Sequence, residues 1–190
     1  MNFTEPVASR PGDRHSVRVT RWLWSASLLG LVAIFLIPAA PVQASSENGA
    51  AVTRSTTGAL TAEYFASRLF ARTNYRRVAR GCRPLRLDPA LVLAAQRHSD
   101  LMSYTADLSH RLAGEGDLVA RDVAAGYTHW RILAENLAWG QATPRAVFHD
   151  WVQSPEHRAN LDNCRLRDVG FGVAFSGGRP WVTADFGRHL

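Results

Sequence analysis

The sequence predicts an α+β fold, a three-layer α-β-α sandwich in which a small antiparallel sheet lies between helices. Residues 168–186 alternate between bulky side chains, such as Phe171 and Val173, and small ones, such as Gly170 and Gly172, around a Ser-Gly-Gly turn. This pattern is typical of a β-hairpin with one bulky face and one small face. The small face lets another layer approach closely, and several helical segments precede the hairpin, so we expect helices on both sides of the sheet.

Residues 1–44 are predicted to be a secretory signal peptide. Arginines precede an apolar run from Trp22 to Ile37, and Val42-Gln43-Ala44 fits the small-residue pattern of a cleavage site. An uncleaved signal anchor is the alternative, because the run is slightly long for a signal peptide yet shorter than the roughly 20 residues that span a bilayer. Only such an anchor would attach the protein to a membrane. Residues 45–59 are rich in Ser, Thr, Ala and Gly and predict a flexible linker, and residues 60–190 form the expected domain.

Five helices are predicted from the helical spacing of apolar residues and from the residues that typically begin or end a helix. The first is expected over Leu60–Val78, before Gly81, and a short one over Leu118–Ala125, before Gly126. Three more begin at a capping residue followed by proline, and the one that starts at Asp88-Pro89 runs to about Tyr104. The other two begin at Thr143-Pro144 and Ser154-Pro155.

Residues 132–139 are predicted to be extended or irregular, and they contain the carboxylate that organises the candidate site. In an extended segment Glu135 shares one face with Leu133, Leu137 and Trp139, because side chains alternate in direction. Burying an ionised carboxylate without partners is very costly, so Glu135 must meet a cation, a metal or convergent donors, or lie in a cleft. The natural donors are the histidines of the chain, above all His110 and His157.

Two other histidines are assigned to the scaffold. His98 lies on the inward stripe of the second helix, where we expect a core histidine bonded to a carbonyl rather than a ligand. His149 falls off the apolar face of its helix and is expected to be solvated.

The distribution of charge bears on whether the protein binds nucleic acid. The formal net charge is +6 and every basic residue is arginine, but the arginines are scattered and form no dense run, so we expect no nucleic-acid partner.

Cys82 and Cys164 are the only cysteines. In an exported chain a pair favours a disulfide, and a catalytic or metal-binding thiol is the alternative.

Several motifs follow one another in a recognisable order. They are LDPAL, AAQRHSDLM, LSH, AENLAWG, WVQSPEHRANL and a closing VGFGVAF with WVTADFG. The ordered set resembles the CAP superfamily (cysteine-rich secretory proteins, antigen 5 and pathogenesis-related 1) and is most similar to its bacterial secreted SCP-like members. The resemblance covers residues 60–187. It implies an α-β-α sandwich and a cleft of histidines and acids that can bind a divalent cation.

The resemblance also implies a metal-ligand set. The histidine of LSH is His110, the glutamate of AEN is Glu135, and the histidine of the SPxHR segment is His157. Two imidazoles and one carboxylate suit zinc, with an open position for water, and a metal-free cluster with Glu135 between protonated histidines is the alternative. Ser154, Glu156 and His98 are additional cleft candidates. Glu156 stands where bacterial relatives commonly have glycine, and we favour a role for it at the start of its helix.

The preferred function is a secreted, extracellular or envelope-associated binding module. Its ligand would be a small amphiphile, a lipid or an envelope component, with or without a metal. A metal-dependent hydrolase in which Glu135 moves a proton is one alternative, although the sequence contains neither a GxSxG elbow nor an HExxH motif. In the other alternative, His110, Glu135 and His157 form a buried network that only stabilises the fold.

Overall fold

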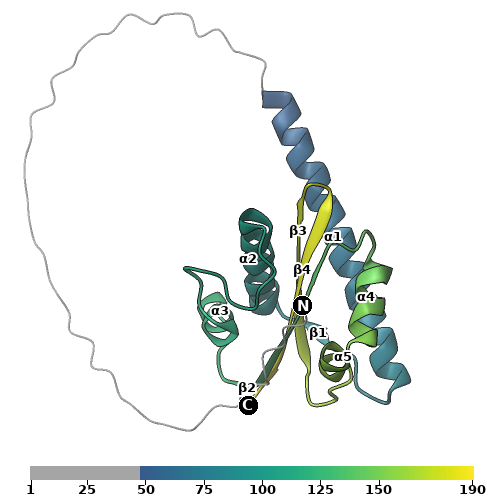
Figure 1. Ribbon diagram of the computed structural model, residues 1–190. Coiled ribbons are helices and arrows are strands. Elements are labelled where there is room, and N and C mark those ends of the chain that lie inside the picture. Colours follow the sequence, from purple (N-terminus) through teal and green to yellow (C-terminus); the bar gives the residue numbers. More distant parts are fainter. Residues whose placement is uncertain (1–47) are drawn as a thin grey trace, which may run out of the picture.

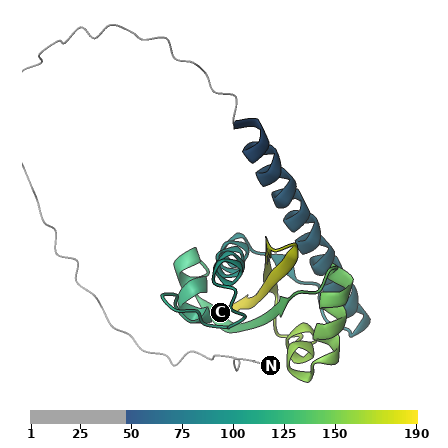
Figure 2. The same ribbon diagram turned by 45° about the horizontal axis from the view of Figure 1, so that its top comes forward.

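The computed structural model describes residues 48–190, with side chains from Thr61 onward, so the predicted leader lies outside the described residues. One sheet lies between two helical layers (Figures 1 and 2). Helices α2 (Pro89–Thr105) and α3 (Leu118–Ala125) cover one face. The other face is covered by α1 (Asn48–Ala79), α4 (Pro144–Gln153) and α5 (Pro155–Leu161). The predicted α+β sandwich is therefore confirmed.

The sheet of the described chain has the strand order β1-β3-β4-β2. Strands β2 (Trp130–Trp139), β3 (Asp168–Ser176) and β4 (Arg179–His189) are antiparallel neighbours. Strand β1 (Arg86–Leu87) pairs in parallel with the start of β3, where the sequence predicts only a connection. Two residues are too few to carry an alternation of side chains, so this strand leaves no periodic signal.

The glycines of β3 bring α2 directly against the sheet. A Cβ atom on Gly170 would lie 2.0 Å from the carbonyl carbon of Leu91, and one on Gly172 would lie 2.2 Å from that of Ala95. The small face predicted for the hairpin is thus the surface on which α2 packs. On the opposite face, Phe171 and Val173 join the main core with Leu69 and Trp151.

The predicted helix starts are confirmed where the cap forms. The Asp88 side chain accepts from the backbone N–H groups of Ala90 and Leu91, and that of Thr143 accepts from Ala146. Ser154 precedes α5 as predicted, but its side chain makes no capping hydrogen bond and its Oγ is buried without a partner. The expected cap role of Ser154 is therefore wrong, and Pro155 provides the start signal.

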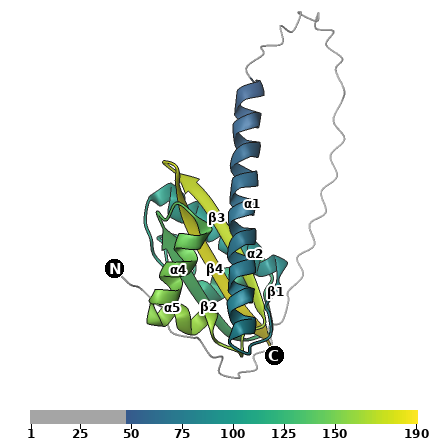
Figure 3. The same cartoon turned by 90° about the vertical axis from the view of Figure 1, so that its right-hand side faces the viewer.

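Helix α1 begins at Asn48 rather than at Leu60, so most of the segment predicted as a flexible linker is helical. Figure 3 shows its N-terminal turns extending past the turn between β3 and β4. Residues 48–79 contain no proline. Once the part of α1 on the sheet is formed, each further turn adds hydrogen bonds without a new nucleation cost.

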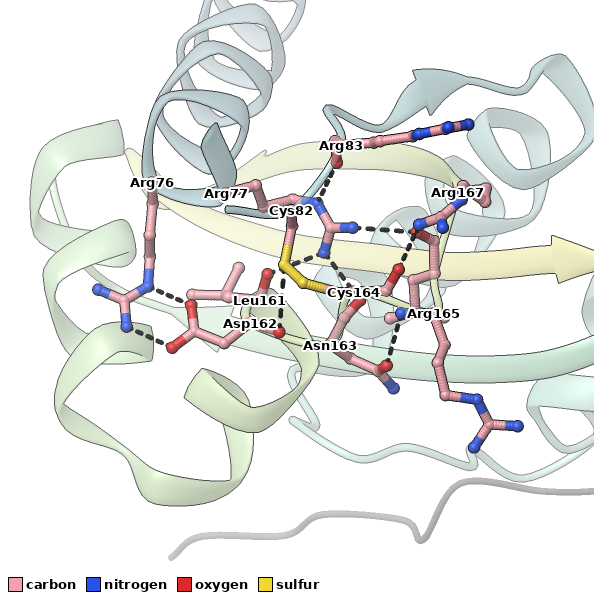
Figure 4. Close-up of a disulfide and its surroundings, with 11 residues drawn as sticks. Arg76, Arg77, Cys82, Arg83, Leu161, Asp162, Asn163, Cys164, Arg165 and Arg167 are labelled. Carbon is pink, nitrogen blue, oxygen red and sulfur yellow. Dashed lines mark hydrogen bonds and ion pairs between the residues drawn. A yellow bond between two sulfur atoms is a disulfide. The ribbon is translucent and has the colours of Figure 1, made fainter. Parts of the chain in front are cut away.

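The predicted disulfide between Cys82 and Cys164 is present, with Cα atoms 4.9 Å apart and a separation of 82 positions in the chain. It ties the end of α1 to the segment after α5 (Figure 4). On a chain-entropy argument it contributes about 4 kcal/mol to stability. The fully buried Arg77 joins the same segments by donating to backbone carbonyls, those of Arg83, Leu161, Asn163 and Leu166.

Candidate functional site

Glu135 lies near the middle of β2, on the face that α2 and α3 cover. Its neighbours two residues away, Leu133 and Leu137, pack on that face against Leu91 and Met102 respectively, as the alternation of the strand predicts. Glu135 is 3% exposed. A carboxylate this deeply buried needs partners that offset the loss of its hydration.

Glu135 has such a partner at each of its oxygens. His110 Nδ1 is 2.6 Å from Oε1, and the Arg121 guanidinium donates to Oε2. His98 Nε2 lies 3.8 Å from Oε2. Burial by itself would raise the pKa of Glu135, but the hydrogen bond from His110 and the charges of Arg121 and His98 lower that pKa below its usual value. Glu135 is therefore an anion that is hydrogen-bonded by one guanidinium and one imidazole, with the His98 ring as a more distant neighbour.

Arg121 is the cation that joins this cluster to the loop before α3. The side chain of Asp117 caps α3 by accepting from the N–H of Ala120, and this places Arg121 at the inner side of the first turn. Besides Glu135, Arg121 donates to the carbonyl of His110 at 2.7 Å, and its Nε lies 3.7 Å from Glu115 Oε1. Arg121 therefore lies between two carboxylates, with 8% of its surface exposed.

His98 is buried in the core, as predicted, but its partner is a carboxylate rather than a carbonyl. His98 Nδ1 lies 2.9 Å from both oxygens of Glu115. His149 is exposed, as expected. His98 thus belongs to the same buried cluster as Glu135, on the side of α2.

Two further acids are buried beside Glu135. Asp185 is its register partner on β4, and Asp122 follows Arg121 on α3; neither is exposed, and their side-chain oxygens accept no geometrically good hydrogen bond from the described residues. Burial, followed by the charge of Glu135, raises the pKa of Asp122 to about 8. Burial, followed by the charges of Asp122 and Glu135, raises the pKa of Asp185 as well. Both acids therefore favour the protonated form.

His157, the third predicted ligand, lies on α5 against the opposite face of the sheet. Its backbone carbonyl accepts from the Asn136 side chain, and its ring makes no hydrogen bond or ion pair with Glu135. Burial lowers the pKa of His157, and the charge of His110 lowers it further. Glu156 is exposed in the first turn of α5, and Ser154 lies at its start, so neither joins the Glu135 cluster.

The arrangement at Glu135 does not fit a divalent cation as it stands. Within the described chain, no three His, Cys, Asp or Glu side chains are placed to hold a metal ion. Both Glu135 oxygens are engaged, one of them by a guanidinium that a metal would have to displace. Zinc at His110, Glu135 and His157 stays a prediction, and it requires Arg121 to leave Glu135 Oε2.

A separate hollow of about 360 Å³, here called the α1–α4 pocket, opens on the other side of the molecule. Its walls include the aromatic side chains Tyr64, Phe65 and Phe175, and the rings of Phe65 and Phe175 meet edge to face at 5.9 Å. Three arginines also line it, namely Arg68, Arg72 and Arg145. None of the three forms an ion pair with a described acid, and Arg72 Nε is buried without a hydrogen-bond partner.

The sequence predicts Glu135 and His110 as site residues, but it gives no prediction for Arg121, Asp122 or Asp185. Asp185 could have been found, because it alternates with Trp181 and Thr183 on the strand face that meets α2. Arg121 and Asp122 stand side by side on a short amphipathic helix, and no local pattern shows that both point inward. The arginines of the α1–α4 pocket come from α1 and α4, which are far apart in the chain, so their convergence has no sequence signal.

The family and structure comparisons agree with this fold. The profile of the CAP family, described as the cysteine-rich secretory protein family, matches residues 70–186. The uncharacterized protein YkwD of Bacillus subtilis (strain 168) is 30% identical over 105 residues, 55% of this chain and 40% of that protein. The chain therefore spans less than half the length of this relative.

Two solved structures share the fold at low identity. An extracellular protein with an SCP domain from Bacillus anthracis has a TM-score of 0.63 and 22% identity, over 79% of this chain and 45% of that one. An outer surface protein of Borrelia burgdorferi has a TM-score of 0.60 and 20% identity, over 64% of this chain and 90% of that one. Across residues 48–190, no helix combines the length and apolar character that a membrane span requires.

Proposed function

The chain belongs to the cysteine-rich secretory protein (CAP) family, and we propose that it is an extracellular binding module that holds a small anionic amphiphile in the α1–α4 pocket. Three observations support the extracellular location. The N-terminal sequence has the pattern of a secretory leader, the domain contains a disulfide, and structures of similar fold include an extracellular and an outer surface protein.

The observation that carries the proposal is the set of three arginines around an aromatic-walled hollow. Arg68, Arg72 and Arg145 bring three positive charges to one pocket, and no described acid neutralises them there. A buried donor without a partner costs about 1–3 kcal/mol, and Arg72 Nε is such a donor. A phosphate or carboxylate oxygen of a ligand would remove this cost.

The apolar half of the ligand follows from the walls. Tyr64 and Phe175 are large aromatic side chains that stay 62% and 37% exposed in the protein alone. An alkyl chain laid along them would bury apolar surface, which is worth about 25 cal/mol per Å². A hollow of about 360 Å³ lies within the usual range for small-ligand pockets, roughly 300–1,000 Å³.

The geometry favours binding over hydrolysis at the Glu135 cluster. A general base must come within hydrogen-bond reach of the proton that it removes. The side chain of Glu135 is only 1% exposed, and both of its oxygens already have partners. The Glu135 side chain is therefore better suited to joining three elements, namely strand β2, helix α2 and the loop before α3, than to contacting a substrate.

Isothermal titration calorimetry with octyl phosphate tests this proposal, with neutral octyl glucoside as the comparison and both below their micelle-forming concentrations. We expect saturable binding of octyl phosphate at one site and at least tenfold weaker binding of octyl glucoside. Arg72→Gln and Tyr64→Ala should each weaken octyl phosphate binding severalfold.

Matched controls lie on the same helix or just after it. Arg80 and Tyr75 are exposed residues of the α1 region that do not line the pocket, so Arg80→Gln and Tyr75→Ala should bind like the parent. Equal affinity for the charged and neutral probes, or equal losses in the pocket and control variants, would overturn the proposal.

A further inference from the structure

Arginine side chains from two distant segments lie together around the disulfide, at the end of α1. Arg77 is buried and donates to backbone carbonyls in both of the segments that the disulfide joins. Arg83 belongs to the segment before β1, and Arg165 and Arg167 belong to the segment before β3. Figure 4 shows Arg83 and Arg165 extending away from the disulfide, with Arg167 between them in this view. The side chains of Arg83, Arg165 and Arg167 are here called the basic loop face.

No described acid forms an ion pair with Arg77 or with the basic loop face. Burial, followed by the charge of Arg167, lowers the pKa of Arg77, whereas the charge of Asp162 raises it. Both oxygens of Asp162 already accept hydrogen bonds from Arg76, at 2.7 and 2.6 Å. The guanidinium groups therefore repel one another, and an anion that binds beside them offsets this repulsion.

The loops that carry the basic loop face are fixed in spite of this repulsion. The disulfide joins them covalently. Arg77 donates to the carbonyls of Asn163 and Leu166 at 3.0 Å, and the Arg86 N–H donates to the carbonyl of Arg167 at 2.9 Å. A ligand therefore meets charges that are already in place, and binding does not have to order the loops first.

The donors of the basic loop face and their position indicate the kind of anion that fits. A guanidinium pairs with phosphate through two parallel N–H···O bonds. The three arginines lie in loops and turns and do not line the α1–α4 pocket, so they meet a ligand from one side without enclosing it. A flexible chain can bring successive phosphates to all three arginines, whereas a DNA duplex stays nearly straight over about 50 nm.

From these observations we infer that the basic loop face binds a flexible polyanion that carries repeated phosphate groups. Each of the three guanidinium groups contacts one phosphate, and binding releases the counterions of the polymer. Arg77 adds its positive charge from the interior without contacting the ligand. This site does not depend on the amphiphile proposed for the α1–α4 pocket, because the arginines of that pocket are different residues.

Isothermal titration calorimetry of the protein with short-chain inorganic polyphosphate, at several salt concentrations, tests the inference. Each phosphate contact on a flexible chain contributes about −0.7 to the slope of log association constant against log salt concentration, so three contacts predict a slope of about −2. Affinity should then fall roughly 20-fold between about 50 and about 200 mM salt.

Two other polyanions of equal total charge serve as comparisons. Polyglutamate should bind severalfold more weakly, because its charges lie on long side chains that must be immobilised. Duplex DNA should also bind severalfold more weakly, because it is too stiff to follow the loops. Absence of saturable polyphosphate binding, or equal or tighter binding of either comparison polymer, would overturn the inference.

Two double variants test the location at equal net charge. Only backbone atoms of Arg83 and Arg165 take part in hydrogen bonds within the described chain, so Arg83→Gln with Arg165→Gln should leave the fold intact. This variant should bind polyphosphate about tenfold more weakly at low salt, with the slope reduced in magnitude by about 1.4. Arg97→Gln with Arg111→Gln, at exposed positions in and after α2, should keep the parent affinity and slope. Equal losses in the two double variants would show an effect of net charge alone and overturn the inference.

Discussion

Glu135 of β2 and Asp185 of β4 lie directly opposite each other in the sheet, and both side chains are buried. Like charges at such cross-strand positions repel, and the protein interior strengthens that repulsion. Glu135 has the nearest cation, Arg121, so it takes the negative charge. Asp185 and its neighbour Asp122 have raised pKa values instead. The cluster thus combines one ionised carboxylate with two acids that favour the neutral form.

This arrangement makes stability depend on pH through Asp122. Its pKa is about 8 in the folded protein, against 3.8 as the ordinary value. When the pKa of a carboxyl group is higher in the folded than in the unfolded protein, the group makes its full contribution to folding stability below the unfolded-state pKa. That contribution is lost as the pH rises from about 4 through about 8. Asp122→Asn removes that loss. We therefore expect the Tm of the variant minus the Tm of the parent to increase by several degrees between pH 5 and pH 8.

Differential scanning calorimetry of both proteins at several pH values measures this difference. Asp107→Asn, at an exposed position after α2, is the control and should differ from the parent by the same amount at every pH. A constant difference for Asp122→Asn would show that Asp122 is ionised in the folded protein.

Glu135→Gln should destabilise the domain substantially. The substitution removes the carboxylate that is hydrogen-bonded to the buried Arg121 guanidinium and leaves only acids without that contact, Glu115 and Asp185, to balance its charge. Removing one partner of a buried ion pair typically costs about 3–5 kcal/mol, which corresponds to roughly 10 °C in Tm for a domain of this size. Glu156→Gln, at an exposed position in the first turn of α5, should lower Tm far less, because an exposed charge at a helix start contributes only about 0.3–1 kcal/mol. Equal Tm values for the two variants in thermal unfolding by circular dichroism would contradict the assigned role of Glu135.

Gly172→Ala tests the close approach of α2 to the sheet. The new methyl group would lie 2.2 Å from backbone atoms of Ala95, so α2 must shift, and overpacking of this kind costs about 1–3 kcal/mol or more. Ala174→Gly, at the next position on the same strand face, removes a methyl group that fits. In urea denaturation we expect the larger loss of unfolding free energy from Gly172→Ala, and the reverse order would contradict the packing.

Zinc addition and chelation test the predicted metal ligands directly. A ligand that binds only the folded state must raise Tm. Because Arg121 and His110 hold both oxygens of Glu135, we expect neither zinc nor EDTA to change the Tm of the parent. A zinc-dependent rise that disappears in both His110→Ala and His157→Ala would instead establish the set of His110, Glu135 and His157.

Features that depend only on neighbouring residues along the chain could be predicted from the sequence. Asp88-Pro89 and Thr143-Pro144 start helices because a cap and a fixed proline φ act within one turn. The alternation of Gly170 and Gly172 with bulky residues is enough to predict both the hairpin and its small face. The inward direction of Glu135 follows from the same period-two rule.

The groups that meet Glu135 could not be predicted in this way, because they come from elements that are brought together by packing. Arg121 reaches it from α3, Asp185 lies beside it through the register of β2 and β4, and His157 belongs to a helix on the other face of the sheet. These relations depend on strand register and on which face each helix covers, and neither is set by local spacing. The free energy that selects them comes from burying many apolar side chains at once, so the partner of a single carboxylate is a consequence of the packing of the whole domain.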